Sequence, residues 1–133
     1  MVPRTKLLTS STERQILRAA LDVVEDPVFV KDDQHRVVIT NRAGCLLLAR
    51  PIDQVLGRTD RDFMPAQQAQ RHFATDQKIL ETGKPEQYEE TLTDASGRVR
   101  DLLTRKRLIQ DSRGQKFVLA HITDLTEFRR AEA

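Results

Sequence analysis

The first periodic pattern of apolar and polar residues lies between residues 10 and 25. Ser10 stands three residues before Glu13, which is the spacing of a capping box at the start of a helix. Apolar residues then recur at helical spacing: Ile16, Leu17, Ala20, Leu21 and Val24. The pattern predicts an amphipathic helix over about residues 11–24. Its apolar side either packs on its own domain or forms a dimer seam, and the sequence leaves both open.

Two short strands are predicted next. Asp26 and Pro27 stop the helix, because the residue before a proline avoids helical geometry. The run VFVKD, from residue 28, and the run RVVIT at 36–40 are rich in β-branched residues, and the turn sequence DDQH joins them. These runs predict a hairpin.

Helical signals dominate the middle of the chain. Asn41 is a suitable N-cap for NRAGCLLLA, and IDQVLG repeats a shorter helical pattern that Gly57 ends. A longer helix is predicted over about residues 66–82, where Gly83 ends it. Its apolar positions are Ala69, Phe73, Ile79 and Leu80.

Three strands are predicted to follow: EQYEETLTD, RVRDLLTRKRLI and QKFVLAHIT, with DASG and QDSRG as their turns. The predicted fold is therefore α+β, with short helices over one face of a five-stranded antiparallel sheet. We expect residues 1–9 to be a disordered lead-in or a vector-derived remnant, 26–124 to form the core and 125–133 to begin an exit helix.

Composition narrows the class of protein. The 133 residues suffice for one domain, and the net charge of +2 comes from acidic and basic residues that alternate throughout the chain. This balance gives no support to nucleic-acid binding, and we interpret RKR at 105–107, with Arg98 and Arg100, as a solvated strand face. Without an apolar run long enough to span a bilayer or a signal peptide, we expect a cytoplasmic module with no membrane insertion.

Few residues suggest chemistry of their own. Cys45 is the single cysteine, so we expect no disulfide and no zinc site, and we interpret it as a small buried apolar residue. Asp60 and Asp62 lie in a short polar turn and are expected to cap the following helix. No phosphate-binding or metalloprotease motif and no nucleophile paired with a base is present, so we expect no enzymatic activity.

Four segments resemble the PAS family of sensory and dimerising modules: DPVFVKDDQHRVVITNRAG, GRTDRDF, ILETGKP and DLTE. The last resembles the signature that joins a PAS sheet to its output helix. The resemblance therefore implies a PAS-like fold in which Asp124 and Thr126 relay a signal into a helix that starts near Leu125. Both side chains also suit a helix start on physical grounds, because they can accept hydrogen bonds from free backbone donors.

The resemblance implies a regulatory module of a bacterial-type signalling protein, such as a histidine kinase of a two-component system or a cyclic-dinucleotide enzyme. We expect a homodimer, a covalently linked effector and a small organic ligand. The implied pocket candidates are Val28, Val30, Ile39, Leu47, Phe63, His72 and Ile122. Strand alternation puts Val118, Ala120 and Ile122 on one face of the last strand and His121 on the other. The resemblance implies that the first set faces the pocket and that His121 lies on the outer face.

Two alternatives remain open. A constitutive dimerisation or scaffold module would fill the pocket with its own side chains, such as Leu47, Phe63, Phe73 and Ile122. A haem gas sensor would use His72, because haem-binding relatives carry an axial histidine on the long helix. A flavin adduct is not expected, since Asp60 occupies the position that resembles the photoreactive cysteine of flavin-binding members.

Overall fold

The structure of the protein, a computed structural model, describes residues 7–94 and 96–132. Residues 1–6 of the expected lead-in at 1–9, Ala95 in the DASG turn and Ala133 lie outside the described residues. The helices are α1 (Ser10–Val23), α2 (Arg42–Leu48), α3 (Ala66–Thr82) and α4 (Thr126–Glu132), with two short 3-10 helices, η1 (Ile52–Gln54) and η2 (Asp60–Asp62). The strands are β1 (Val28–Lys31), β2 (Val37–Thr40), β3 (Glu86–Thr93), β4 (Val99–Gln110) and β5 (Lys116–Asp124).

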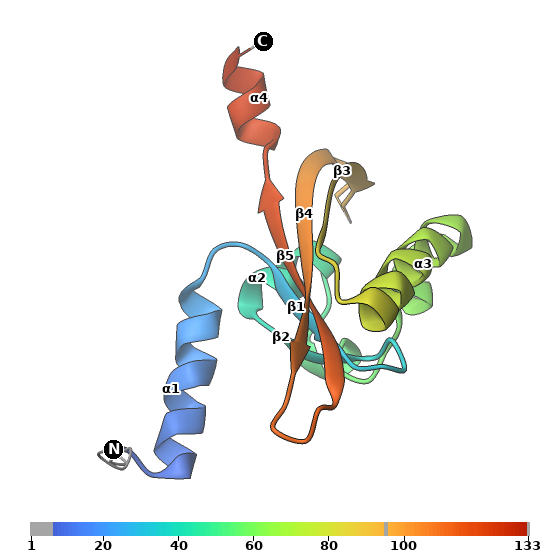
Figure 1. The fold of residues 1–133 in the computed structure, drawn as a ribbon. Coiled ribbons are helices and arrows are strands. Elements are labelled where there is room, and N and C mark those ends of the chain that lie inside the picture. The colour runs from blue at the N-terminus through green and yellow to red at the C-terminus, as the bar shows by residue number, and fades with distance from the viewer. Residues whose placement is uncertain (1–6, 95, 133) are drawn as a thin grey trace.

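All five strands form one antiparallel sheet in the order β2-β1-β5-β4-β3. The pairing of β1 with β5 joins the first hairpin to the last strand, so the two ends of the core meet in the centre of the sheet. The helices α2 and α3 lie against the sheet, whereas α1 and α4 project away from it (Figure 1). The predicted α+β architecture is confirmed. No helix among residues 7–94 and 96–132 is long and apolar enough to cross a membrane.

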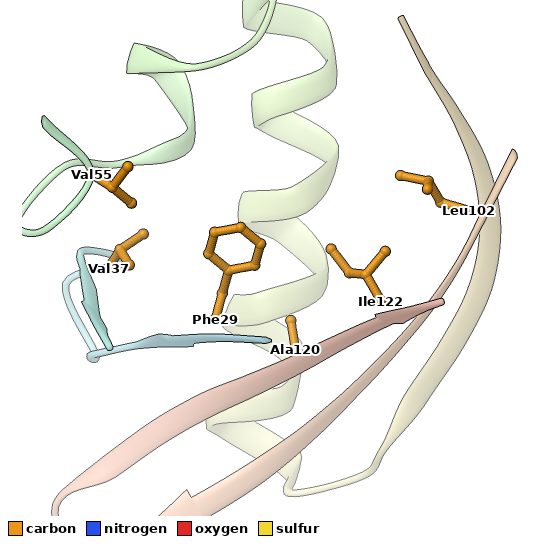
Figure 2. Close-up of a cluster of buried hydrophobic side chains, with 6 residues drawn as sticks. All are labelled: Phe29, Val37, Val55, Leu102, Ala120 and Ile122. Atoms are coloured by element: carbon orange, nitrogen blue, oxygen red, sulfur yellow. The ribbon is translucent and has the colours of Figure 1, made fainter. Parts of the chain in front are cut away.

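The main apolar core lies between the sheet and the segments that follow β2. Figure 2 shows Phe29 at its centre, between Val37 and Val55 on one side and Ile122 and Leu102 on the other. Ala120 completes the cluster beneath the ring. Each large side chain buried in this way contributes about 1.5–3 kcal/mol to stability.

A bulge in the first hairpin determines which side chains of β2 face the core. Val30 pairs with Ile39 and Lys31 pairs with Val37, so Val38 is an extra residue in β2. Directly opposed residues share a face of the sheet. Val37 therefore lies on the inner face with Lys31, whereas Ile39 lies on the outer face with Val30.

This register corrects three of the pocket candidates. Phe29 and Lys31 point to the inner face, and Val28 and Val30, one residue out of phase, point to the outer face. Ile39 pairs with Val30, so it lies on the same outer face, and it is 42% exposed. The prediction that Val28, Val30 and Ile39 line the pocket is therefore wrong.

Asn41 is the predicted N-cap of α2, and it also joins three segments of the chain. Its side-chain oxygen accepts hydrogen bonds from the backbone N–H groups of Gly44 (2.9 Å) and Val28 (3.1 Å). Its amide nitrogen donates to the carbonyl oxygens of Leu21 and Asp26, each at 3.0 Å. The side chain is completely buried, so these bonds tie the end of α1 to β1 and α2 without competition from water.

The helix boundaries differ from prediction mainly at their caps. The N-cap of α1 is Thr9, whose side chain accepts from the backbone N–H of Thr12, so the expected capping box at Ser10 is wrong by one residue. The helix ends at Val23. The predicted bounds of α3 are confirmed, and Gly83 ends it in the left-handed conformation (φ 71°), which favours glycine.

Candidate functional site

A cavity of about 70 Å³ lies between the inner face of the sheet, α2, η2 and α3. Its walls are mostly apolar, and Phe29, Leu92 and Leu102 are among them. One end is polar and is lined by Lys31, Asp60, Gln68, His72, Glu90, Thr104 and Lys106. An apolar chamber with a few polar groups at one end is the usual form of a small-molecule site.

The structure brings four of the pocket candidates together: Leu47, Phe63, His72 and Ile122 line this cavity. Phe73, which was expected to help fill the space, lies outside it. Its ring is 51% exposed and stacks on the ring of His35, with 4.0 Å between the ring centroids. The reason is the helical phase of α3, which turns Ala69, His72 and Asp76 inward and Phe73 outward.

A buried carboxylate shared by two lysines closes the polar end. Lys31 Nζ donates to Asp76 Oδ2 at 2.9 Å, and Lys106 Nζ donates to Asp76 Oδ1 at 2.7 Å. Asp76 is 1% exposed and Lys106 is 2% exposed, so these ion pairs lie out of water. Because the three residues belong to α3, β1 and β4, the cluster joins the long helix to two strands of the sheet.

Asp60 extends this cluster instead of capping α3. Lys31 Nζ donates to Asp60 Oδ2 at 2.5 Å. Asp62 accepts from the backbone N–H of Thr59 (3.1 Å) and so caps its own 3-10 helix, η2. The N-cap of α3 is Pro65, which makes no side-chain cap bond. The prediction that Asp60 and Asp62 cap the following helix is therefore wrong.

His72 is held by hydrogen bonds at both ring nitrogens. Its Nδ1 lies 3.1 Å from Tyr88 Oη and 3.2 Å from Lys106 Nζ, two groups that can donate. Its Nε2 lies 3.1 Å from Glu90 Oε2, which can only accept when ionised. This pattern assigns the ring proton to Nε2, with Nδ1 as the acceptor.

These contacts do not fit a haem. An axial histidine needs one ring nitrogen free to bind iron, and both nitrogens of His72 are engaged. The cavity of about 70 Å³ is also much smaller than a porphyrin. In the described part of the chain, no group of three or more His, Cys, Asp or Glu side chains is placed to hold a metal ion.

The charged neighbours shift the pKa values of the buried groups. Burial alone would raise the pKa of Asp76, but the ammonium groups of Lys31 and Lys106 outweigh it and hold this pKa below its ordinary value. Burial likewise acts to raise the pKa of Glu90, but the hydrogen bonds from His72 and Thr104 and the nearby charge of Lys106 together outweigh it, so this pKa is also lowered. The pKa of Tyr88 is raised, first by burial and then by the negative charge of Glu90.

Sequence reasoning missed Lys31, Lys106 and Asp76. Lys106 was assigned to a solvated face, yet only its neighbours Arg105 and Arg107 are exposed. Strand alternation could have found Lys106, because it lies in phase with Leu102 and Thr104, which are both buried. No local signal could have found Asp76, whose partners are 45 and 30 residues away.

The junction between β5 and α4 is held by side-chain bonds at the residues predicted to relay a signal. Asp124 Oδ1 accepts from the backbone N–H of Thr126 at 2.9 Å. Thr126 Oγ1 accepts from the backbone N–H of Asp101 in β4 at 2.9 Å, and Arg100 Nη1 donates to Asp124 Oδ2 at 3.1 Å. Thr126 is buried, so the first residue of α4 is attached to β4 as well as to β5.

Two other residues singled out in the sequence lie away from the polar cluster. Cys45 is half-buried against the main core, and burial raises the pKa of its thiol. His121 is partly exposed and does not line the cavity; its Nε2 lies 2.9 Å from Asp26 Oδ2. Neither residue contributes to the chemistry of the cavity.

Comparison with known proteins places the chain in a family. A family model described as the PAS fold matches residues 21–130. The uncharacterized protein y4lL of Sinorhizobium fredii is 35% identical over 133 residues, covering 98% of this chain and 16% of y4lL. The methanogenesis regulatory histidine kinase FilI of Methanothrix harundinacea is 28% identical over 115 residues, covering 86% of this chain and 13% of FilI.

Solved structures agree with this fold. The VqmA–ligand–DNA complex of Vibrio cholerae superimposes with a TM-score of 0.76 at 24% identity, covering 90% of this chain and 52% of the VqmA chain. The chain belongs to the PAS family and is a sensory signalling module. It spans less than a fifth of the curated relatives that it matches.

Replacing Asp76 tests the buried cluster. We expect Asp76→Asn to lower the free energy of unfolding near neutral pH by about 3 kcal/mol, because it leaves two buried ammonium groups without their shared carboxylate. Urea unfolding followed by circular dichroism measures this. Glu86→Gln is the matched control, because its partner Lys78 is 64% exposed, and it should cost less than about 1 kcal/mol.

The dependence of stability on acidic pH is a second test of the buried cluster, made with the same Asp76→Asn variant. The pKa values of Asp76 and Glu90 are lowered in the folded protein, so the unfolded chain binds more protons in acid. Their stabilisation is complete above the ordinary values of 3.8 and 4.5 and is lost as the pH falls toward the lowered values. The loss of stability below about pH 4 should be shallower in Asp76→Asn. An identical acid slope in both proteins would contradict this assignment.

Proposed function

We propose that this module binds a small organic molecule in the cavity and passes the resulting change through α4 to an effector elsewhere in the full-length protein. The observation that carries the proposal is the polar end of an otherwise apolar cavity. Side chains that merely filled the space would not need two lysines, a histidine and carboxylates there, because burying charge is costly. The proposal assigns no catalytic step to this chain.

The dimensions of the cavity limit the ligand. A volume of about 70 Å³ would hold on the order of five water molecules, or one compact organic molecule. VqmA, which shares the fold, has been solved in complexes with a ligand and with DPO. A bound small molecule is therefore compatible with this architecture, and we propose the same for this chain.

The effector that we propose is a histidine kinase or a cyclic-dinucleotide enzyme. The similarity to FilI, a histidine kinase, supports the first of these. In either case the covalent connection would run through α4, which leaves the sheet after β5 and points away from it (Figure 1).

The edge strand β3 is well placed to carry the change from cavity to helix. Glu90 lines the cavity and contacts His72, and its neighbour Glu89, on the opposite face of β3, forms an ion pair with Arg129 of α4. A second ion pair joins Arg98, just before β4, to Glu127 of α4. An edge strand has only one neighbour in the sheet, so a ligand that displaces Glu90 can shift β3 and bias the position of α4.

Filling the cavity tests ligand binding. Native mass spectrometry of freshly purified protein should show a non-covalent adduct, and Ala120→Leu should eliminate it, because Ala120 lines the cavity and the larger side chain occupies the space. Ala74→Leu, on the exposed side of α3, is the control and should retain the adduct. Retention of the same adduct by Ala120→Leu, or the lack of any adduct and of any stabilising compound in a fragment screen, would contradict the proposal.

Hydrogen exchange tests the relay. Asp124→Ala removes the side chain that accepts from the first residue of α4, so exchange of the amides of α4 should accelerate by about fivefold, the effect of losing a helix cap worth about 1 kcal/mol. Asp111→Ala removes an equivalent cap in the turn between β4 and β5 and should leave α4 unchanged. Equal exchange of α4 in Asp124→Ala and wild-type protein would argue against a relay at this residue.

Dimerisation is the second function that we propose, and it also underlies the scaffold alternative. None of the residues of α1 is buried, and Ile16 and Leu17 are 50% and 58% exposed. The helix is anchored at its C-terminal end, where Arg18 donates to the carbonyl oxygen of Thr40 and Asp22 accepts from the backbone N–H of Arg42. Its apolar side is therefore held in place for the same helix of a second copy.

Sedimentation velocity tests this interface. Wild-type protein should sediment as a dimer, and Leu17→Glu should raise the dimer dissociation constant by at least about tenfold, because it puts a charge into an apolar seam. Gln15→Glu adds the same charge next to the stripe and serves as the control. A wild-type monomer, or a dimer that Leu17→Glu leaves intact, would rule out α1 as the contact.

A further inference from the structure

The two lysines at the polar end of the cavity suggest an anionic ligand, but the carboxylates around them favour an uncharged one. We infer that the cavity selects an uncharged molecule, with an apolar body and a polar edge that carries a hydrogen-bond acceptor beside a donor, and that it rejects carboxylates. This inference rests on the proposed ligand-binding function and specifies the chemical class of its ligand.

The charges of the cluster favour an uncharged ligand. The ammonium groups of Lys31 and Lys106 lie among three carboxylates, those of Asp60, Asp76 and Glu90. His72 accepts at Nδ1 and donates from Nε2, so it adds no charge. The cluster therefore carries one net negative charge.

The lysines are already neutralised by their neighbours. Each of the two ammonium groups contacts the buried carboxylate of Asp76, and Lys31 also binds Asp60. A carboxylate ligand would add a second net negative charge next to the buried carboxylate of Asp76. Like charges brought together in such surroundings are strongly unfavourable.

The hydrogen-bonding capacity that remains defines the polar edge of the ligand. An ammonium group has three N–H donors, and in the described part of the chain Lys31 and Lys106 each use two, so each retains one for an acceptor. Asp60 Oδ1 accepts no hydrogen bond from any described residue, so it can accept one from an N–H or O–H group of a ligand. A carboxamide-like edge satisfies both groups at once, whereas a carboxylate offers only acceptors.

Isobutyramide and isobutyrate test the selection directly, because they share one branched apolar body and differ in the charge of the polar end. Each compound is titrated into the full chain at neutral pH, and the amide signals of cavity residues are followed by two-dimensional NMR. Isobutyramide should bind with a dissociation constant at least about tenfold lower than that of isobutyrate. Ala120→Leu, which fills the cavity, should abolish the shifts caused by isobutyramide.

Removing a negative charge from the cluster should reduce the preference for isobutyramide over isobutyrate. Glu90→Gln and Asp60→Asn each replace a carboxylate by an amide of nearly the same shape, and either should bring the two dissociation constants closer together by several-fold. Glu86→Gln, on the same strand as Glu90, is the control, because Glu86 does not line the cavity and pairs with the exposed Lys78. It should leave the ratio unchanged.

The outcomes separate the two hypotheses. If isobutyrate binds at least as tightly as isobutyramide, the inferred selectivity is overturned while ligand binding stands. If Glu90→Gln and Asp60→Asn both fold and leave the ratio unchanged, the charge argument is overturned. If neither compound shifts the signals of cavity residues, the inferred selectivity is overturned, whereas ligand binding itself fails only if native mass spectrometry and the fragment screen are also negative.

Discussion

The shared ion pairs of Asp76 with Lys31 and Lys106 hold the rest of the structure in its working arrangement. They connect α3 to β1 and β4, so the helix that covers the sheet is attached to it by buried charge as well as by apolar contacts. Lys31 and Lys106 also line the polar end of the cavity. The geometry of the polar end therefore depends on ion pairs whose attraction is largely offset by the cost of desolvation, although the loss of one partner is destabilising.

The two termini of the core are attached to the same sheet by different means. At the beginning, the buried amide of Asn41 bonds to the end of α1 and to β1. At the end, Thr126 and Asp124 bond α4 to β4 and to its own first turn. Both projecting helices thus begin or end on rigid, hydrogen-bonded positions. These hydrogen bonds fix the points at which the two helices join the core.

The protein has two candidate sites of different character, the cavity inside the core and the exposed apolar side of α1. Inside, the polar end of the cavity is crowded with charged groups that satisfy one another and leave a few hydrogen-bonding positions for a ligand. On the outside, α1 exposes apolar side chains to solvent, and an exposed apolar patch is typical of an interaction surface. The two observations are independent, so the proposals of ligand binding and of dimerisation stand or fall separately.

The sequence by itself determined the order of the elements, the bounds of the helix at 66–82, the cap at Asn41 and the family, because caps, turns and periodicity act between residues a few positions apart. It could not show which face of β1 points inward, since that face is set by the pairing of Phe29 with Ala120 and of Lys31 with Val118 in the distant strand β5. Nor could it pair Lys31 and Lys106 with Asp76, because such partners meet only when distant segments pack. The tertiary structure alone decided these points, and they include the polar half of the candidate site.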